Sequence, residues 1–116
     1  LISGAPRIGT EGLALALSAR RRDALDDLAS ELRQRHPGLQ VSVHVHDVTD
    51  YASSDALVRD AAQALGGLSA VFVNAGIGLG GRIGGKSFDK QQRTIETNLL
   101  GAMALTDAAV RHFRAH

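Results

Sequence analysis

The chain has 116 residues, about the size of one small domain, and 44% of them are apolar, which is enough for a buried core. Its formal net charge of +1 argues against nucleic acid or an acidic membrane surface as a partner. The absence of cysteine excludes disulfides, thiolate metal sites and a cysteine nucleophile. Apolar runs are too short for a membrane span and we find no signal peptide, so we expect a cytoplasmic protein without a membrane partner.

Short apolar strands alternate with amphipathic helices in the first half of the chain. Residues Leu13 to Leu17 form an apolar run without a polar face, which is typical of a strand buried on both sides. The segment Arg22 to Arg35 carries aliphatic residues at helical spacing, and Pro37 and Gly38 end it. In Gln40 to His46, three valines alternate with polar residues, which predicts a strand.

The same alternation continues in the middle of the chain. Asp50 or Ser53 can cap a helix that extends to Leu65, and two glycines then end it. The residues Ala70 to Val73 predict another short buried strand. Strands that alternate with helices in this way predict an α/β fold, with a parallel sheet covered by helices on both faces.

A glycine-rich loop, residues 76–85, leads into a long predicted helix from about Phe88 to Ala115. Six residues lie near one face of that helix: Ile95, Leu99, Met103, Thr106, Val110 and Phe113. The segment Gly76 to Gly81 also fits the pattern G-x-G-x-x-G, but further glycines follow it where a helix should open. We therefore interpret this segment as a loop beside the site and not as a second phosphate-binding fingerprint.

Glycine or polar residues stand where the predicted strands end. These segments are Ser3-Gly4-Ala5, Arg20-Arg21, His46-Asp47-Val48 and Asn74-Ala75-Gly76. Open α/β sheets bind ligands at the carboxyl ends of their strands, and a glycine turn before a helix lets the backbone approach a phosphate. Taken alone, Gly4 and Gly9 are equally consistent with ordinary turns.

Together, the ordered motifs resemble the short-chain dehydrogenase/reductase family. The motifs that carry the resemblance are Gly4-Ala5, Asp47-Val48, Asn74-Ala75-Gly76 and Asn98. The resemblance covers nearly the whole chain and implies a Rossmann-type doubly wound parallel sheet. It also implies an NAD(P)(H)-dependent oxidoreductase that transfers hydride between the nicotinamide and a carbonyl or secondary alcohol. Because the chain starts at Leu1 and stops inside a predicted helix, we expect residues 1–116 to be a partial NAD(P)-binding domain, with the C-terminal half absent.

The resemblance also implies roles for individual residues. Asp47 matches the residue that meets the adenine amino group, Val48 flanks the ring, and the segment Asn74 to Gly76 lines the ribose side. Asn98 matches the asparagine of the catalytic tetrad, which bends its helix and holds a water in the proton relay. The full set of cofactor-binding candidates is Ser3, Gly4, Arg7, Gly9, Arg20, Arg21, Asp47, Val48, Asn74, Ala75 and Gly76.

The charges after the second strand favour NADP(H), with NAD(H) possible. An acidic residue at this position holds the ribose hydroxyls of NAD, whereas a 2′-phosphate needs a cation. This chain has Arg20 and Arg21 there and no acidic residue before Asp23. Arg7 is a second basic candidate, at a position where the family often carries one. The alternative is that these arginines only solvate the start of a helix.

Two features depart from the family pattern. Only eight residues, Ala5 to Gly12, separate the turn glycine from the next strand, whereas a parallel crossover needs about a dozen or more. The first crossover helix is therefore shortened, either by a real deletion or because residues are missing between Gly4 and Leu13. The Ser and Tyr-x-x-x-Lys of the family's acid–base machinery are also absent, because Asp55 stands four residues after Tyr51, the only tyrosine. We expect Tyr51 to be a surface residue and the chain alone to be inactive.

Other interpretations stay open at this stage. A non-catalytic nucleotide-binding or scaffold protein would use the same fold. His44 and His46 could form half of a metal site, but we favour a solvated strand face and expect no metal. The basic cluster from Arg111 to His116 is either a polar helix face or, as in the family, part of a contact between subunits. We therefore expect a homo-oligomer through this helix and a small carbonyl or alcohol substrate.

Overall fold

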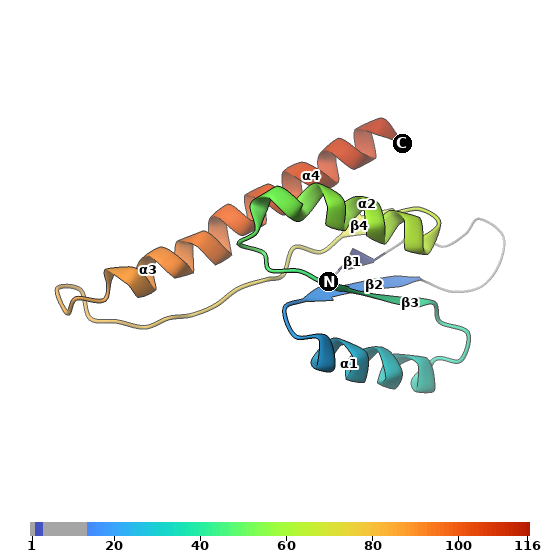
Figure 1. Cartoon of the computed structure of the whole chain (residues 1–116), viewed down its shortest axis with the longest axis horizontal. Coiled ribbons are helices and arrows are strands. Elements are labelled where there is room, and N and C mark those ends of the chain that lie inside the picture. Colours follow the sequence, from blue (N-terminus) through green and yellow to red (C-terminus); the bar gives the residue numbers. More distant parts are fainter. Residues whose placement is uncertain (1, 4–13) are drawn as a thin grey trace.

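The computed structural model describes residues 2–3 and 14–116, which form a four-stranded sheet with helices on both faces (Figure 1). The predicted residues Gly4, Arg7 and Gly9 lie outside the described part. The strands have the order β3-β2-β1-β4 in the sheet. They are β1 (Ile2–Ser3), β2 (Leu15–Ala19), β3 (Val41–Val45) and β4 (Ala70–Val71).

Two layers of helices bury the two faces of β2. Helix α1 (Arg22–Arg35) covers one face, where Leu17 packs with Leu25, Ala29 and Val41. Helices α2 (Ser54–Leu65) and α4 (Ala102–Ala115) cover the other face (Figure 1). There the core is built largely from small residues: Ala14, Ala16, Ala61 and Ala108, with Leu57, Val58, Leu65 and Leu105. The predicted α/β fold with a sheet between helices is confirmed.

The strand β1 differs from the predicted parallel arrangement. Strands β2 and β3 are parallel, in register from Leu15 opposite Val41 to Ala19 opposite Val45. By contrast, β1 runs antiparallel to both of its neighbours, with Ile2 opposite Ala16 and Val71. The short connection explains this direction, because a parallel return would need a crossover of about a dozen or more residues, usually with a helix.

Most predicted boundaries agree with the structure. Helix α1 has the predicted bounds, while β2 begins and ends two residues later than the predicted Leu13 to Leu17. Ser53 occupies the N-cap position of α2 after a 3-10 turn, Tyr51–Ser53, but its hydroxyl bonds elsewhere. Gly66 ends α2 in the left-handed conformation, with φ of 71°, as the predicted glycine stop requires.

The long predicted helix is interrupted near its middle. Helix α3 (Phe88–Ile95) continues into a π-helical segment, η2 (Glu96–Gly101), and then into α4. In Figure 1, α3 extends away from the sheet while α4 lies over it. The buried side of α4 consists of Leu105, Ala108 and Ala109. The five large apolar residues of the predicted face are exposed instead: Ile95, Leu99, Met103, Val110 and Phe113. That face does not form the core.

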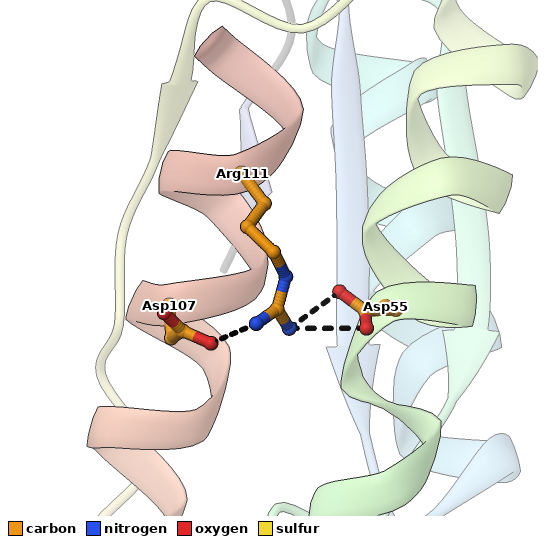
Figure 2. Close-up of polar contacts among 3 residues, drawn as sticks. All are labelled: Asp55, Asp107 and Arg111. Atoms are coloured by element: carbon orange, nitrogen blue, oxygen red, sulfur yellow. Dashed lines mark hydrogen bonds and ion pairs between the residues drawn. The ribbon is translucent and has the colours of Figure 1, made fainter. Parts of the chain in front are cut away.

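An exposed ion-pair cluster joins α4 to the start of α2. Figure 2 shows Arg111 between Asp107, one turn earlier on α4, and Asp55 in the first turn of α2. The Arg111 Nη2 donates to both carboxylate oxygens of Asp55, at 2.9 and 3.0 Å, and these bonds raise the pKa of the guanidinium. Because all three side chains are exposed to solvent, the cluster adds little to the stability of the fold.

In the part of the chain that the structure describes, no helix is long and apolar enough to cross a bilayer.

The two-sided burial of β2 predicts a large effect of truncating its central side chain. Leu17 is 1% exposed between α1 and β3, so Leu17→Ala should lower the free energy of unfolding by about 2–5 kcal/mol. Leu28→Ala is the matched control, because Leu28 lies on α1 with 42% of its surface exposed and should lose much less. Urea unfolding followed by circular dichroism measures both. Equal losses for the two variants would contradict the described core.

Candidate functional site

A cavity of about 330 Å³ opens where β2 and β3 end and where the chain leaves β4. Because the two parallel strands end in register, the residues that follow them lie side by side at one edge of the sheet. Three lining residues come from the end of β2 and the position after it, and eight follow β3 and β4. The full lining is Ser18, Ala19, Arg20, His46, Asp47, Val48, Phe72, Asn74, Ala75, Gly76 and Ile77, with Leu57, Thr97 and Leu105 from the helical segments.

The structure brings together most of the candidate residues that lie within its described part. Arg20, Asp47, Val48 and the segment Asn74 to Gly76 all line the cavity. Arg21 follows Arg20 in the sequence, but it is the N-cap residue of α1 and does not line the cavity. Ser3 lies in β1, and the segment 76–81 is a loop without regular secondary structure. The loop interpretation of that segment is therefore confirmed.

Asp47 is held as an ionised hydrogen-bond acceptor. Its Oδ1 accepts the Thr49 backbone N–H at 3.0 Å and the Thr49 hydroxyl at 2.8 Å. These two bonds are the main causes that lower the pKa of the Asp47 carboxyl, and the positive charge of Arg20 adds to them. The turn thus orients an anionic acceptor next to a cationic side chain at the mouth of the cavity.

His46 is a site residue that the sequence interpretation did not identify. Ser53 Oγ donates to the Asp50 carbonyl at 3.0 Å, so its single proton is committed and it accepts from His46 Nδ1 at 3.1 Å. Burial lowers the pKa of His46, against the opposing charges of Asp50 and Asp47, and its Nε2 is buried without a hydrogen-bond partner among the described residues. Burial thus favours the neutral form of His46, and a proton on Nδ1 would satisfy the contact with Ser53.

The expected solvated strand face is wrong for both histidines. His44 is also half-buried, and its Nε2 lies 3.0 Å from the Ser42 hydroxyl. Burial lowers the pKa of His44, with the charge of Asp60 opposing. The alternation of polar residues in this strand suggested an exposed side, but helix α2 packs against β3 and Ser53 contacts His46.

Asn98 connects the π-helical segment to the rim of the cavity. Its side-chain Oδ1 accepts the Ile77 N–H at 2.8 Å, and its Nδ2 donates to the Ile77 carbonyl at 2.8 Å. The amide group thus pairs with the backbone of Ile77 as a neighbouring strand would. Single π-turns inside α-helices are frequent at functional sites, and this one carries the only candidate catalytic residue of the chain.

Gly101 lets the π-helical segment pack directly against the end of β3. A Cβ atom at this position would lie 2.7 Å from Val48 Cγ2 and 2.8 Å from the Val48 carbonyl oxygen. Such distances are too short for a side chain to be accommodated without movement of the backbone, so the close approach requires glycine. The segment that carries Asn98 is therefore in contact with a residue that lines the cavity.

Comparison with known proteins identifies the family. The chain matches the short chain dehydrogenase family over residues 3–116, and it belongs to this family. An uncharacterized oxidoreductase of Mycobacterium tuberculosis is 39% identical over 103 residues, which are 89% of this chain and 41% of that protein. The chain therefore spans about two fifths of the length of this relative.

Solved structures of the family have the same fold. An alcohol dehydrogenase from the archaeon Thermococcus sibiricus, complexed with 5-hydroxy-NADP, is 32% identical with a TM-score of 0.78, over 88% of this chain and 43% of that one. A xylitol dehydrogenase bound to NAD+ is 26% identical with a TM-score of 0.77, over 85% and 38% of the two chains. Both forms of the nicotinamide cofactor thus occur among these structural relatives.

The burial of His46 predicts a specific pH dependence of stability. Because the pKa of folded His46 lies below the ordinary value of 6.5, the unfolded chain binds more protons just below that pH. The free energy of unfolding should therefore fall as the pH drops below about 6.5. Above that pH the contribution of His46 to stability is complete. His46→Gln should reduce this slope, measured by urea unfolding at a series of pH values.

His36→Gln, at the exposed end of α1, controls for the substitution itself. An unchanged slope in His46→Gln would show that His46 is not held neutral by the fold.

Proposed function

We propose that the chain supplies the cofactor-binding part of an NADP(H)-dependent oxidoreductase. The observation that carries the proposal is the cavity at the strand ends, where the anionic acceptor Asp47 and the cation Arg20 lie together. The bound cofactor would supply hydride exchange with a carbonyl or secondary alcohol, while the protein binds and orients it. The family assignment supports this reaction class.

The described residues fit the adenosine half of the cofactor. Asp47 offers an oriented carboxylate to the adenine amino group, and Val48 offers an apolar contact to the ring. The segment Asn74 to Gly76 also lines the cavity, and we assign it to the ribose side. The family pattern would assign the pyrophosphate to Ser3, Gly4, Arg7 and Gly9, of which only Ser3 belongs to the described residues. Ser3 does not support that role, because it pairs with Leu15 at the start of β2, whereas the cavity lies at the other end of this strand.

The position of Arg20 supports NADP(H) over NAD(H). Arg20 lines the cavity directly after β2, close enough to Asp47 to lower the pKa of its carboxyl. A guanidinium there can pair with a 2′-phosphate, for which NAD(H) has only a hydroxyl. Arg21, at the N-cap position of α1, is one residue further on and is a second candidate for the same phosphate.

Asn98 is the one member of the catalytic tetrad that we assign within this chain. Tyr51 does not take the role of the catalytic tyrosine, because Asp55 occupies the position of the lysine and the Tyr51 hydroxyl bonds to the Glu96 carbonyl. A serine and a Tyr-x-x-x-Lys pair would come from the part of a full-length family member that this chain does not cover. A cytoplasmic location also stays a prediction from the sequence.

A cofactor titration tests the proposal. NADPH should bind more tightly than NADH, and Arg20→Ala should weaken NADPH binding by about tenfold while changing NADH binding little, because only NADPH has the 2′-phosphate. Arg22→Ala is the matched control, since the Arg22 Nε is paired with Asp26 at 3.0 Å on the surface of α1. Isothermal titration calorimetry measures the affinity of the unsubstituted chain and of both variants for each cofactor. Equal affinities of the unsubstituted chain for NADPH and NADH would contradict the assignment of Arg20.

We also propose that the exposed apolar side of α4 is a contact between two copies of the chain. Met103 is 60% exposed and Phe113 is 40% exposed, and Leu99 and Val110 add to the same helix surface. Contiguous exposed apolar residues of this kind mark interaction sites. The basic residues Arg111 and Arg114 lie in the same helix and would form the polar margin of the contact.

Sedimentation velocity over a range of concentrations tests this contact. The unsubstituted chain should form dimers or larger oligomers, and Met103→Glu should shift it toward the monomer, because a buried unpaired carboxylate is costly. Leu28→Glu, which places the same charge on exposed α1, should leave the oligomer intact. A monomeric unsubstituted chain at every concentration would rule the contact out.

A further inference from the structure

We propose that Tyr51 is a positioning residue that holds the π-helical segment so that Asn98 can clamp the backbone of Ile77. The proposal starts from a long-range contact. The Tyr51 hydroxyl donates to the Glu96 carbonyl oxygen at 3.2 Å, across 45 positions of the sequence. Glu96 is the first residue of the π-helical segment, and Asn98 follows two residues later.

Tyr51 is well placed for this role by its own local structure. It begins the 3-10 turn that leads from the end of β3 into α2, directly after Asp50. Bonds from Asp50 N–H to the Asp47 carbonyl and from Ser53 N–H to the Asp50 carbonyl fix this turn, at 2.9 and 3.2 Å. The phenol therefore extends from a rigid corner of the fold next to the cavity.

The π-helical segment needs external support. A π-turn is wider than an α-turn and is rare, so neighbouring groups decide whether it persists. Three contacts hold it: a hydrogen bond from Tyr51 to Glu96, the hydrogen bonds between Ile77 and Asn98, and the close packing of Val48 against Gly101. The Tyr51 contact lies at its N-terminal end and the Val48 contact at its C-terminal end, with the Asn98 clamp between them.

Loss of the Tyr51 hydroxyl should therefore weaken the hydrogen bonds at Ile77 as well as the contact at Glu96. The Asn98 side chain reaches both the N–H and the carbonyl of Ile77 at 2.8 Å, a geometry that requires the segment to stay in place. If Glu96 is released at the N-terminal end of the segment, both bonds open more often. Ile77 lines the cavity, so this opening would loosen the rim of the site.

Amide hydrogen exchange of the 116-residue chain, followed by NMR without any cofactor, tests the inference. Tyr51→Phe keeps the ring and removes only the hydroxyl. We expect the Ile77 amide to exchange about fivefold faster, the effect of losing one neutral hydrogen bond, while core amides of α2 such as Val58 and Ala61 keep their rates.

Thr94→Val is the matched control. The Thr94 hydroxyl donates to the Lys90 carbonyl at 2.8 Å within the regular helix α3, so this variant also removes a hydroxyl donor to a helix carbonyl. It should leave Ile77 unchanged.

The result does not depend on cofactor binding, so it is separable from the test of the proposed function. An unchanged Ile77 rate in Tyr51→Phe would overturn the inference. Equal acceleration of Ile77 and the α2 core amides would also overturn it, because that pattern indicates a general loss of stability.

Discussion

The parallel pairing of β2 with β3 is the constraint on which the site depends. Five residue pairs in register make the two strands end at the same level, so Arg20 and Asp47 emerge next to each other. Neither residue is informative alone, since arginine and aspartate are common at the ends of strands. Together they place a fixed anion acceptor and a cation at one edge of the sheet, where the chain leaving β4 closes the cavity. The antiparallel direction of β1 leaves this pairing unchanged, but it places Ser3 opposite Leu15, at the other end of β2 from the cavity.

Small side chains allow the helical layer to approach this edge closely. Alanines at positions 16, 61 and 108 are almost completely buried between β2, α2 and α4. Such residues contribute little apolar area each but let backbones come near one another, so the position of α4 is set by close packing. The same principle operates where Gly101 meets Val48. The cavity is thus bordered by backbone that has little room to move, which suits a site that must orient a ligand.

Sequence patterns predicted the layered fold because periodicity and turn residues determine it locally. Helix α1 has a regular apolar stripe and a Pro-Gly stop, and both of its predicted ends agree with the structure. The strand-end residues Arg20, Asp47, Val48 and Asn74 to Gly76 were also predicted to lie together and do so. The direction of β1, the role of His46 and the Tyr51–Glu96 bond depend on contacts between distant segments, which periodicity does not encode. The apolar face of the last helix was visible in the sequence, but its exposure was not, because either the core or a partner could cover it.

The π-helical segment changes the rotation of helix α3 relative to α4. Each residue turns an α-helix by about 100°, so one extra residue within a turn changes the phase of all later side chains by that amount. The side chains of α3 therefore lie at a rotation about the helix axis that a continuous α-helix would not give them, while α4 packs on α2 (Figure 1). The π-helical segment thus sets the rotation of α3 relative to α4 about the helix axis.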